Sequence, residues 1–334
     1  MNNYEITKYL VLRFSRIHLF TMFGLPKSCQ LNKQAKRHVL PLILDVGRAI
    51  DGGLGRIKAW FWVIVVTKTG FVDRKFMAAN HSFKTGTSPI VFAAVHDGHE
   101  IRDELEGLFN LTEGERLREE DPYTSKWVEG SDNGIVVHHS RFEADVNRPR
   151  DKGVYQRPED AWGLQVWKSP LSAEVLNRSL EVYDGFYRAC GSFFDELFSQ
   201  HQNIIVYDIH SYNHRRESAQ QEADPAENPE VNIGTQNMDR ERWHPVVESL
   251  MQHFRSFDYS GRRLDTRENI KFKGGYFGKW LYSRYGKNIC PVSIEFKKFF
   301  MDEHTGEGYE NDLELIGRML RSSRKPVLEA LKSL

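Results

Sequence analysis

Residues 90–100 read IVFAAVHDGHE, six apolar residues followed at once by a polar run. A short apolar run that ends in this way is typical of a buried strand in an α/β protein. In open α/β sheets, ligands bind beyond the carboxyl ends of the strands. The polar residues after the run are therefore candidates for a functional site, and His96 is the first of them.

A second apolar run, Ile204–Ile209 (IIVYDI), also ends in polar residues, His210 and Ser211. Asp208 and His210 are two positions apart, so on a strand their side chains point to the same side, and Asp208 could orient the His210 ring. Zinc hydrolases typically hold the metal with three histidine or carboxylate ligands and leave one position for water. Two strands that each end in histidine therefore predict a metal site with His96 and His210 as ligands.

Carboxylates close to the first strand are candidates for a third ligand. Glu100 follows His96 by four residues, and the acidic run Glu119–Glu120–Asp121 precedes Pro122. Such a run is usually the solvated end of a helix. However, a proline after Asp121 stops a helix and fixes the local chain, which favours an oriented carboxylate. The residues alone leave the choice among these carboxylates open.

Further apolar runs at Ile135–Val137 and Pro291–Phe296 predict two more strands. Helical periodicity predicts three helices: after the N-cap Ser172, over Asp239–Phe254, and from Asp312 to the C-terminal end. Pro326 either kinks the last helix or divides it in two. Strands that alternate with helices indicate an α/β fold with a sheet covered by helices.

Glu295 is a single carboxylate inside the apolar run PVSIEF. Glutamates are rarely buried without a task, and burial would raise the pKa of Glu295 toward the value that a general base needs. The alternative is an edge strand whose outer face carries Glu295 and Lys297 in a salt bridge. The sequence leaves both interpretations open.

Two further segments offer groups that could bind a substrate. Residues 140–150 contain Arg141, Arg148 and Arg150, and a guanidinium binds a carboxylate through two parallel hydrogen bonds. Lys273–Gly274–Gly275 contains a glycine pair, which permits close approach of the backbone to a ligand but is also typical of a plain turn. An acidic substrate is therefore expected if the histidines form a site.

The composition is that of an ordinary globular protein, with 46 basic residues against 46 acidic ones. This balance argues against a nucleic acid as partner. The cysteines Cys29, Cys190 and Cys290 lack the paired spacings of zinc sites or disulfide frameworks, so a reducing, cytoplasmic location is expected. The run Ala59–Val66 is far shorter than the roughly 20 residues of a membrane helix, so it predicts a buried strand and no membrane partner.

Residues 1–75 differ from the rest of the chain. They carry 13 Lys and Arg against 4 Asp and Glu, whereas residues 76–334 are acidic overall. Met1–Phe23 is basic and apolar, but charged residues interrupt it and no small-residue cleavage site follows, which disfavours a signal peptide. We expect residues 1–75 to form an N-terminal extension and residues 76–334 to form a single main catalytic domain.

The order of these motifs resembles the N-formylglutamate amidohydrolase family over roughly residues 85–305. The matching elements are His96–Asp97–Gly98, Arg118–Asp121, Ser140–Arg141 with Asn147–Arg148, Asp208–Ser211, Asn232–Thr235, Phe272–Tyr276, Ile294–Glu295 and Met301–Glu303. Two positions depart from the expected patterns. The family more usually has serine where Asp97 stands, and the carboxypeptidase pattern His-x-x-Glu would need a glutamate where His99 stands.

The resemblance implies a zinc-carboxypeptidase-like α/β fold, a mixed sheet flanked by helices, and hydrolysis of an N-acyl amide of a small acidic amino acid such as N-formyl-L-glutamate. It also implies residue roles, with one zinc ion as the cofactor. The metal ligands would be His96, His210 and Asp121, with Glu120 as the rival of Asp121. Glu295 would be the general base, and the substrate would bind Arg141, Asn147, Arg148, Lys273 and Gly274. A deacylase or peptidase acting on another N-acyl amino acid, and a non-catalytic binding protein of the same fold, are the alternatives.

Overall fold

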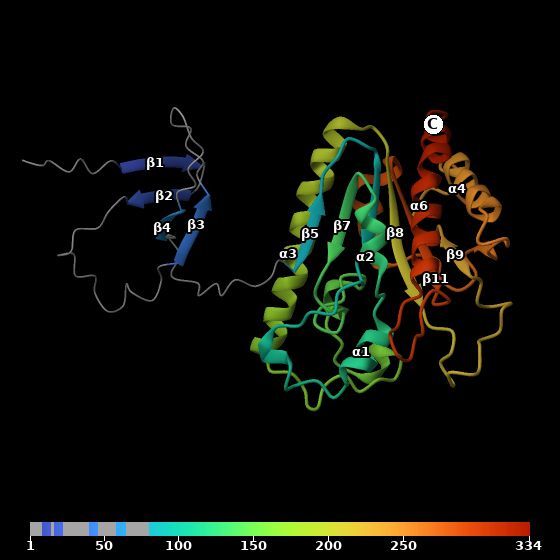
Figure 1. Ribbon diagram of the computed structural model, residues 1–334, viewed down its shortest axis with the longest axis horizontal. Coiled ribbons are helices and arrows are strands. Elements are labelled where there is room, and N and C mark those ends of the chain that lie inside the picture. The colour runs from blue at the N-terminus through green and yellow to red at the C-terminus, as the bar shows by residue number, and fades with distance from the viewer. Residues whose placement is uncertain (1–8, 15–16, 23–39, 46–57, 65–79) are drawn as a thin grey trace, which may run out of the picture. The chain divides into compact units, whose positions relative to one another are not determined.

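The computed structural model describes residues 9–14, 17–22, 40–45, 58–64 and 80–334 (Figure 1). The chain divides into two compact units, Met1–Phe76 and Met77–Leu334. The strands of the first unit form one antiparallel sheet in the order β1-β2-β4-β3: β1 (Tyr9–Phe14), β2 (Ile17–Met22), β3 (Leu40–Asp45) and β4 (Lys58–Ile64). The strand expected at Ala59–Val66 is thus present as β4, whereas its burial, and residues 1–8, 15–16 and 23 of the segment Met1–Phe23, lie outside the described residues.

The second unit is built on a mixed sheet of seven strands in the order β10-β9-β11-β8-β6-β7-β5. The strands are β5 (His81–Lys84), β6 (Ile90–Ala94), β7 (Asn133–Val137), β8 (Ile204–Tyr212), β9 (Val231–Gly234), β10 (Thr266–Glu268) and β11 (Ile289–Lys297). The central strand β8 runs parallel to both β6 and β11, and β9 and β5 pair in the antiparallel direction with β11 and β7. The four predicted strands are confirmed as β6, β7, β8 and β11.

Six α-helices of the described chain accompany this sheet: α1 (Glu113–Glu119), α2 (Thr124–Glu129), α3 (Ala173–Gln200), α4 (His244–Ser256), α5 (Tyr276–Tyr285) and α6 (Glu310–Leu331). Ser172 caps α3 by accepting a hydrogen bond from the backbone N–H of Val175. The helix predicted from Asp239 begins only at His244, and Asp239 lies before it, where its side chain accepts a hydrogen bond from the Arg242 N–H and its carbonyl accepts one from the Trp243 N–H. The last helix is one continuous element with Pro326 inside it.

The helices cover both faces of the sheet, and strict alternation along the strands decides which side chain meets which helix (Figure 1). Ile205, Tyr207 and Ile209 of β8 join the hydrophobic core under α4 and α6. Ile204 and Val206 join the core under α3 and α5. The fold is therefore the predicted α/β arrangement of a mixed sheet flanked by helices.

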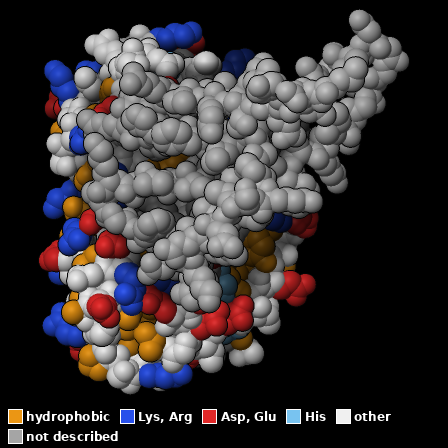
Figure 2. Space-filling model, turned by 90° about the vertical axis from the view of Figure 1, so that its left-hand side faces the viewer, with side chains coloured by type: hydrophobic (Ala, Val, Ile, Leu, Met, Phe, Trp, Pro, Cys, Tyr) orange, Lys and Arg blue, Asp and Glu red, His pale blue; other side chains and the backbone are white. Residues whose placement is uncertain are grey.

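None of the described helices is both long and apolar enough to cross a membrane. On the coloured part of the face in Figure 2, Lys and Arg side chains are interspersed with Asp and Glu, so no continuous basic surface is seen there.

The core under α3 provides a test of packing. Phe194 is fully buried there, whereas Ser192 on the same helix is exposed. Removing a buried aromatic ring loses its burial and leaves a cavity, so we expect Phe194→Ala to lower the free energy of unfolding by about 3–5 kcal/mol. Urea unfolding at pH 7 measures this, with Ser192→Ala as a control that stays within about 0.5 kcal/mol of the wild type. Equal effects of the two variants would contradict the described packing.

Candidate metal centre

The pairing of β8 with β11 brings three polar side chains to one side of the sheet. Because Ile209 and Ile294 face the core under α4 and α6, their neighbours in the two strands face the opposite side. His210 lies directly beside Glu295 in the register of the two strands, and Asp208 precedes His210 by two positions. His96 lies two residues beyond the end of β6, the strand that pairs with β8 on its other side.

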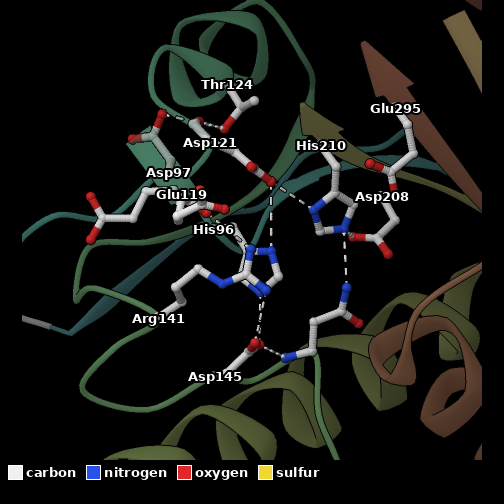
Figure 3. Close-up of polar contacts among 12 residues, drawn as sticks. His96, Asp97, Glu119, Asp121, Thr124, Arg141, Asp145, Asp208, His210 and Glu295 are labelled. Atoms are coloured by element: carbon white, nitrogen blue, oxygen red, sulfur yellow. Dashed lines mark hydrogen bonds and ion pairs between the residues drawn. The ribbon is translucent and has the colours of Figure 1, made fainter. Parts of the chain in front are cut away.

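Asp121 joins the two histidines in a buried cluster (Figure 3). One ligand atom from each of His96, Asp121 and His210 lies within 4.8 Å of the other two. Asp121 Oδ2 is 2.9 Å from His210 Nδ1 and 3.6 Å from His96 Nδ1. Both imidazole rings therefore turn the same nitrogen toward one carboxylate oxygen, and one ligand atom of each residue is close enough to the others to bind a shared cation.

The second nitrogen of each ring contacts another buried carboxylate (Figure 3). His96 Nε2 is 2.7 Å from Asp145 Oδ1, and His210 Nε2 is 3.0 Å from Asp208 Oδ1. The His96 contact is a hydrogen bond, whereas the Asp208 oxygens have no hydrogen-bond partner among the described residues and His210 Nε2 also lies 3.3 Å from the Asn147 side-chain nitrogen. Histidines that bind metals almost always donate their other N–H to an outer partner, which fixes the tautomer and the orientation of the ring, and Asp145 is such a partner for His96. The donor set and its surroundings therefore fit a divalent ion such as zinc.

The position of Asp121 is fixed by its neighbours in the chain. α1 ends at Glu119, and the Asp121 N–H donates to the His96 carbonyl at 2.9 Å. The buried Lys298 ammonium donates to the Arg118 and Glu120 carbonyls at 2.6 and 2.7 Å. Burial alone would raise the pKa of the Asp121 carboxyl, but hydrogen bonds with the two histidines hold it below its usual range. Asp121 is therefore held as a carboxylate facing the rings.

The other two candidates for a third ligand lie outside the cluster. Glu120 is fully buried, but its carboxylate contacts His99 Nδ1 and accepts a hydrogen bond from Ser140. Glu100 is exposed, and only its backbone takes part in the local structure. Among the described residues, only His96, Asp121 and His210 form such a group.

Asp97, in the first of the quoted motifs, contacts the start of α2. Its carboxylate accepts a hydrogen bond from the Ser125 N–H at 2.8 Å and lies 3.3 Å from the Thr124 hydroxyl (Figure 3). These contacts satisfy the first turn of α2, where backbone N–H groups have no partner within the helix. Asp97 therefore stabilises a short helix beside the cluster.

Glu295 lies on the central part of the sheet, so the edge-strand alternative is wrong. β11 has a neighbour on each side, β8 and β9, and the Glu295 side chain is buried at the wall of the cavity. Burial raises the pKa of Glu295 to about 7, and the carboxyl accepts a hydrogen bond from Ser293 at 3.0 Å. A carboxyl with this pKa can both take and return a proton near neutral pH.

The predicted clamp residues differ in how free they are. Arg141 is largely buried, and its guanidinium bonds to Asp145 at 2.9 Å and to the Tyr155 hydroxyl at 3.1 Å. Arg148 is more exposed and lies 3.7 Å from Asp145. The Asn147 side chain accepts a hydrogen bond from the Phe277 N–H at 2.8 Å. Arg148 is thus the better placed of the two arginines to receive a substrate carboxylate.

The segment that contains Lys273 and Gly274 is held against the end of β9. The Asn232 carboxamide oxygen accepts N–H groups from Ile270 and Lys271, and its nitrogen donates to the Phe272 carbonyl. Gly274 has a φ of +129°, a conformation that favours glycine. A Cβ on Gly234 would come within 2.8 Å of the Gly274 nitrogen, so the two glycines permit this close packing.

These segments enclose a cavity of about 590 Å³ that contains the cluster. Its wall includes seven cationic side chains: Arg141, Arg148, Arg216, Lys271, Lys273, Lys279 and Lys298. Only three carboxylates share the wall, namely Glu119, Asp121 and Glu295. The chain as a whole is neutral, so this surplus of cations on the wall is local. Asp145, behind the wall, offsets part of it at Arg141 and Arg148, and the remainder favours an anionic ligand.

Sequence reasoning missed two residues that support the cluster. Asp145 lies in the quoted Arg-rich segment, and its position four residues after Arg141 was the available signal. Lys298 stands just after the apolar run that contains Glu295, but its hydrogen bonds join segments about 180 positions apart. Only the folded chain reveals such a contact.

The fold and the site define a class of protein: an α/β protein with two histidines and a carboxylate beyond parallel strands, beside a buried glutamate in a cationic cavity. The model of the N-formylglutamate amidohydrolase family matches residues 88–301, which is more than half of the chain. The chain therefore belongs to the N-formylglutamate amidohydrolase family, and the resemblance inferred from the motifs is confirmed.

Solved structures show the same fold. N-formylglutamate amidohydrolase from Ralstonia eutropha JMP134 is 14% identical, with a TM-score of 0.61, and the match covers 77% of this chain and 100% of that chain. A gene product of Agrobacterium tumefaciens is 13% identical, with a TM-score of 0.56, and the match covers 76% and 97% of the two chains. Curated protein sequences yield no match.

Glu303, in the last of the family motifs, anchors the segments around the cavity. Its buried carboxylate accepts N–H groups from His214 at 2.8 Å, from Arg215 at 2.9 Å, and from the Arg118 guanidinium at 3.1 Å. Burial alone would raise the pKa of Glu303, but the hydrogen bonds from His214, Arg118 and Arg215 lower it to about 2. Glu303 thus ties the chain after β8 to the end of α1.

This lowered pKa predicts how stability depends on pH. Because the folded pKa lies below the unfolded value, the contribution of the Glu303 carboxylate is complete above about pH 5 and is lost as the pH falls toward 2. We expect Glu303→Gln to lower the free energy of unfolding by about 1–3 kcal/mol at pH 7. The difference from wild type should shrink between pH 5 and pH 3 in urea unfolding. A difference that does not change over this range would contradict the assignment.

Proposed function

We propose that this protein is a metal-dependent amidohydrolase that cleaves the N-acyl amide of an acidic amino acid, with N-formyl-L-glutamate as the first candidate substrate. The observation that carries this proposal is the His96–Asp121–His210 cluster beside the buried Glu295. The family supplies the reaction class, hydrolysis of an amide. The surplus of cations around the cluster supports an acidic substrate.

In this proposal His96, Asp121 and His210 hold one zinc ion. When bound, zinc supplies Lewis acidity, which polarises a carbonyl and makes water more acidic. Asp145 and Asp208 keep the two imidazole rings oriented toward the ion.

Glu295 performs the proton transfers. Its pKa of about 7 suits a group that takes a proton from the attacking water and then delivers it to the amine that leaves. Arg148, assisted by Asn147, binds the carboxylate of the amino acid and so aligns the amide with Glu295. Arg141 acts mainly by holding Asp145, its closest ionic partner. The free, buried Cys190 and Cys290 suit the reducing cytoplasm in which we place the enzyme.

The role of Glu295 is tested by Glu295→Gln. The variant keeps the shape of the side chain but cannot accept a proton, so we expect kcat for N-formyl-L-glutamate to fall roughly 100- to 10,000-fold. Formate release measures this, and elemental analysis should still find one zinc per chain. Glu196→Gln, on the exposed side of α3, is the matched control and should keep wild-type activity. Activity that survives in Glu295→Gln would overturn the assignment of the base.

The ligand set is tested by a pair of adjacent acids. Asp121→Asn should weaken zinc binding by more than the roughly 10- to 100-fold typical of losing an outer hydrogen-bond partner of a metal ligand. Glu120→Gln should leave the affinity within a few-fold, since Glu120 contacts His99 and Ser140 instead. Competition with a chromophoric chelator measures both affinities. A larger loss of zinc affinity in Glu120→Gln than in Asp121→Asn would mean that Glu120, and not Asp121, is the ligand.

A further inference from the structure

Lys271 is a cation on the cavity wall whose contacts are all with neutral groups. Its ammonium donates a hydrogen bond to the Asn228 side-chain oxygen and lies 5.3 Å from the centre of the Tyr212 ring. Its backbone N–H is held by Asn232 at 2.9 Å. No carboxylate forms an ion pair with Lys271 among residues 80–334. A positioned cation without an anionic partner is typical of a site that awaits an anion.

Charged groups of both signs lie near Lys271. Burial lowers the pKa of Lys271, Arg216 lowers it further, and Glu227 raises it. The charge of Arg216 is balanced by Glu119, which it contacts through two nitrogens at 3.0 and 2.9 Å.

Lys271 and Arg148 line the same cavity as the cluster but have different contacts. Arg148 lies beside Asp145, the carboxylate that contacts His96. Lys271 lies over Tyr212, which follows His210 by two positions on β8 and so faces the same side of the strand. Both line the cavity of about 590 Å³ that contains the cluster. The cavity therefore offers two separate cationic groups.

We propose that Lys271 is a second carboxylate-binding subsite, so that the substrate is a dicarboxylate held between Arg148 and Lys271 across the metal cluster. This inference rests on the proposed hydrolase function and specifies its substrate class. The second carboxylate belongs either to the side chain of the amino acid or to the far end of the acyl group. Both sources present the same chemistry to Lys271.

Two pairs of compounds distinguish these sources. N-formyl-L-glutamate and N-formyl-L-glutamine differ only in the side-chain carboxylate, whereas N-succinyl-L-glutamine and N-butyryl-L-glutamine differ only at the end of the acyl group. We expect the charged member of one pair to have the higher kcat/KM by roughly 10- to 100-fold in the wild type. Lys271→Met should reduce that ratio to about threefold or less and leave the neutral member within about twofold. Lys271→Arg should retain most of the discrimination.

Controls separate a binding role from a structural one. Lys325→Met, at an exposed position of α6, should leave both ratios unchanged. If Lys271 only tethers the chain at Asn228, Lys271→Met would lower both members of each pair equally, and the inference would be wrong. It would also be wrong if neither ratio responded to Lys271→Met while N-formyl-L-glutamate was still hydrolysed.

Calorimetric binding of the same compounds to the Glu295→Gln protein keeps the test independent of turnover. A preference for one charged compound that is lost in Glu295→Gln/Lys271→Met would support the subsite even if the wild type hydrolysed none of the four compounds. In that case the proposed reaction would fail and the subsite would stand. Absence of any such preference in binding would overturn the subsite.

Discussion

The parallel pairing of β8 with β6 on one side and with β11 on the other is the constraint on which the rest of the second unit depends. It brings the carboxyl ends of three strands together, and with them His96, His210 and Glu295. A slip of one residue in β8 would turn His210 toward the apolar core under α4 and α6. The apolar residues that alternate with Asp208 and His210 prevent such a slip, because they would then face the polar cavity.

This arrangement buries several charged groups, which is unfavourable by itself. Contacts with the surrounding residues offset the unfavourable energy. Asp121 and Asp145 are almost fully buried, and an isolated carboxylate in such a place would become protonated. Each instead faces a histidine, and Asp145 also contacts Arg141. Lys298 has the opposite role, since burial lowers its pKa to about 8 while its ammonium holds the backbone beside Asp121. The His96–Asp121–His210 cluster is thus one part of a larger network of compensated charges.

Several family motifs act on the shape of the cavity and leave its chemistry to other residues. Glu303 ties the chain after β8 to α1, and Asn232 holds the turn that carries Lys271. Gly234 and Gly274 allow that turn to pack closely on β9. The family motifs therefore include residues of the cluster and residues that only support the cavity. The contacts in the structure are needed to distinguish the two kinds.

The sequence by itself determined the class of fold, four central strands of the sheet, the capped helix α3 and the family. Local signals are sufficient for these features, because apolar periodicity, an N-cap serine and ordered motifs depend on neighbours in the chain. It also singled out His96, His210 and Glu295, since each stands in or just after an apolar strand. The predicted start of α4 was wrong, since Asp239 lies in a turn that precedes the helix.

Only the tertiary structure decided between Asp121, Glu120 and Glu100, and between a buried and an edge position for Glu295. These choices depend on which strand pairs with which and on where adjacent side chains point, and neither is encoded in local spacing. The tertiary structure likewise decided three further contacts: Asp145 with His96, Lys298 with the backbone beside Asp121, and Lys271 with the Tyr212 ring. Each is a contact between residues distant in the chain, and its strength arises from the low dielectric that the assembled fold creates.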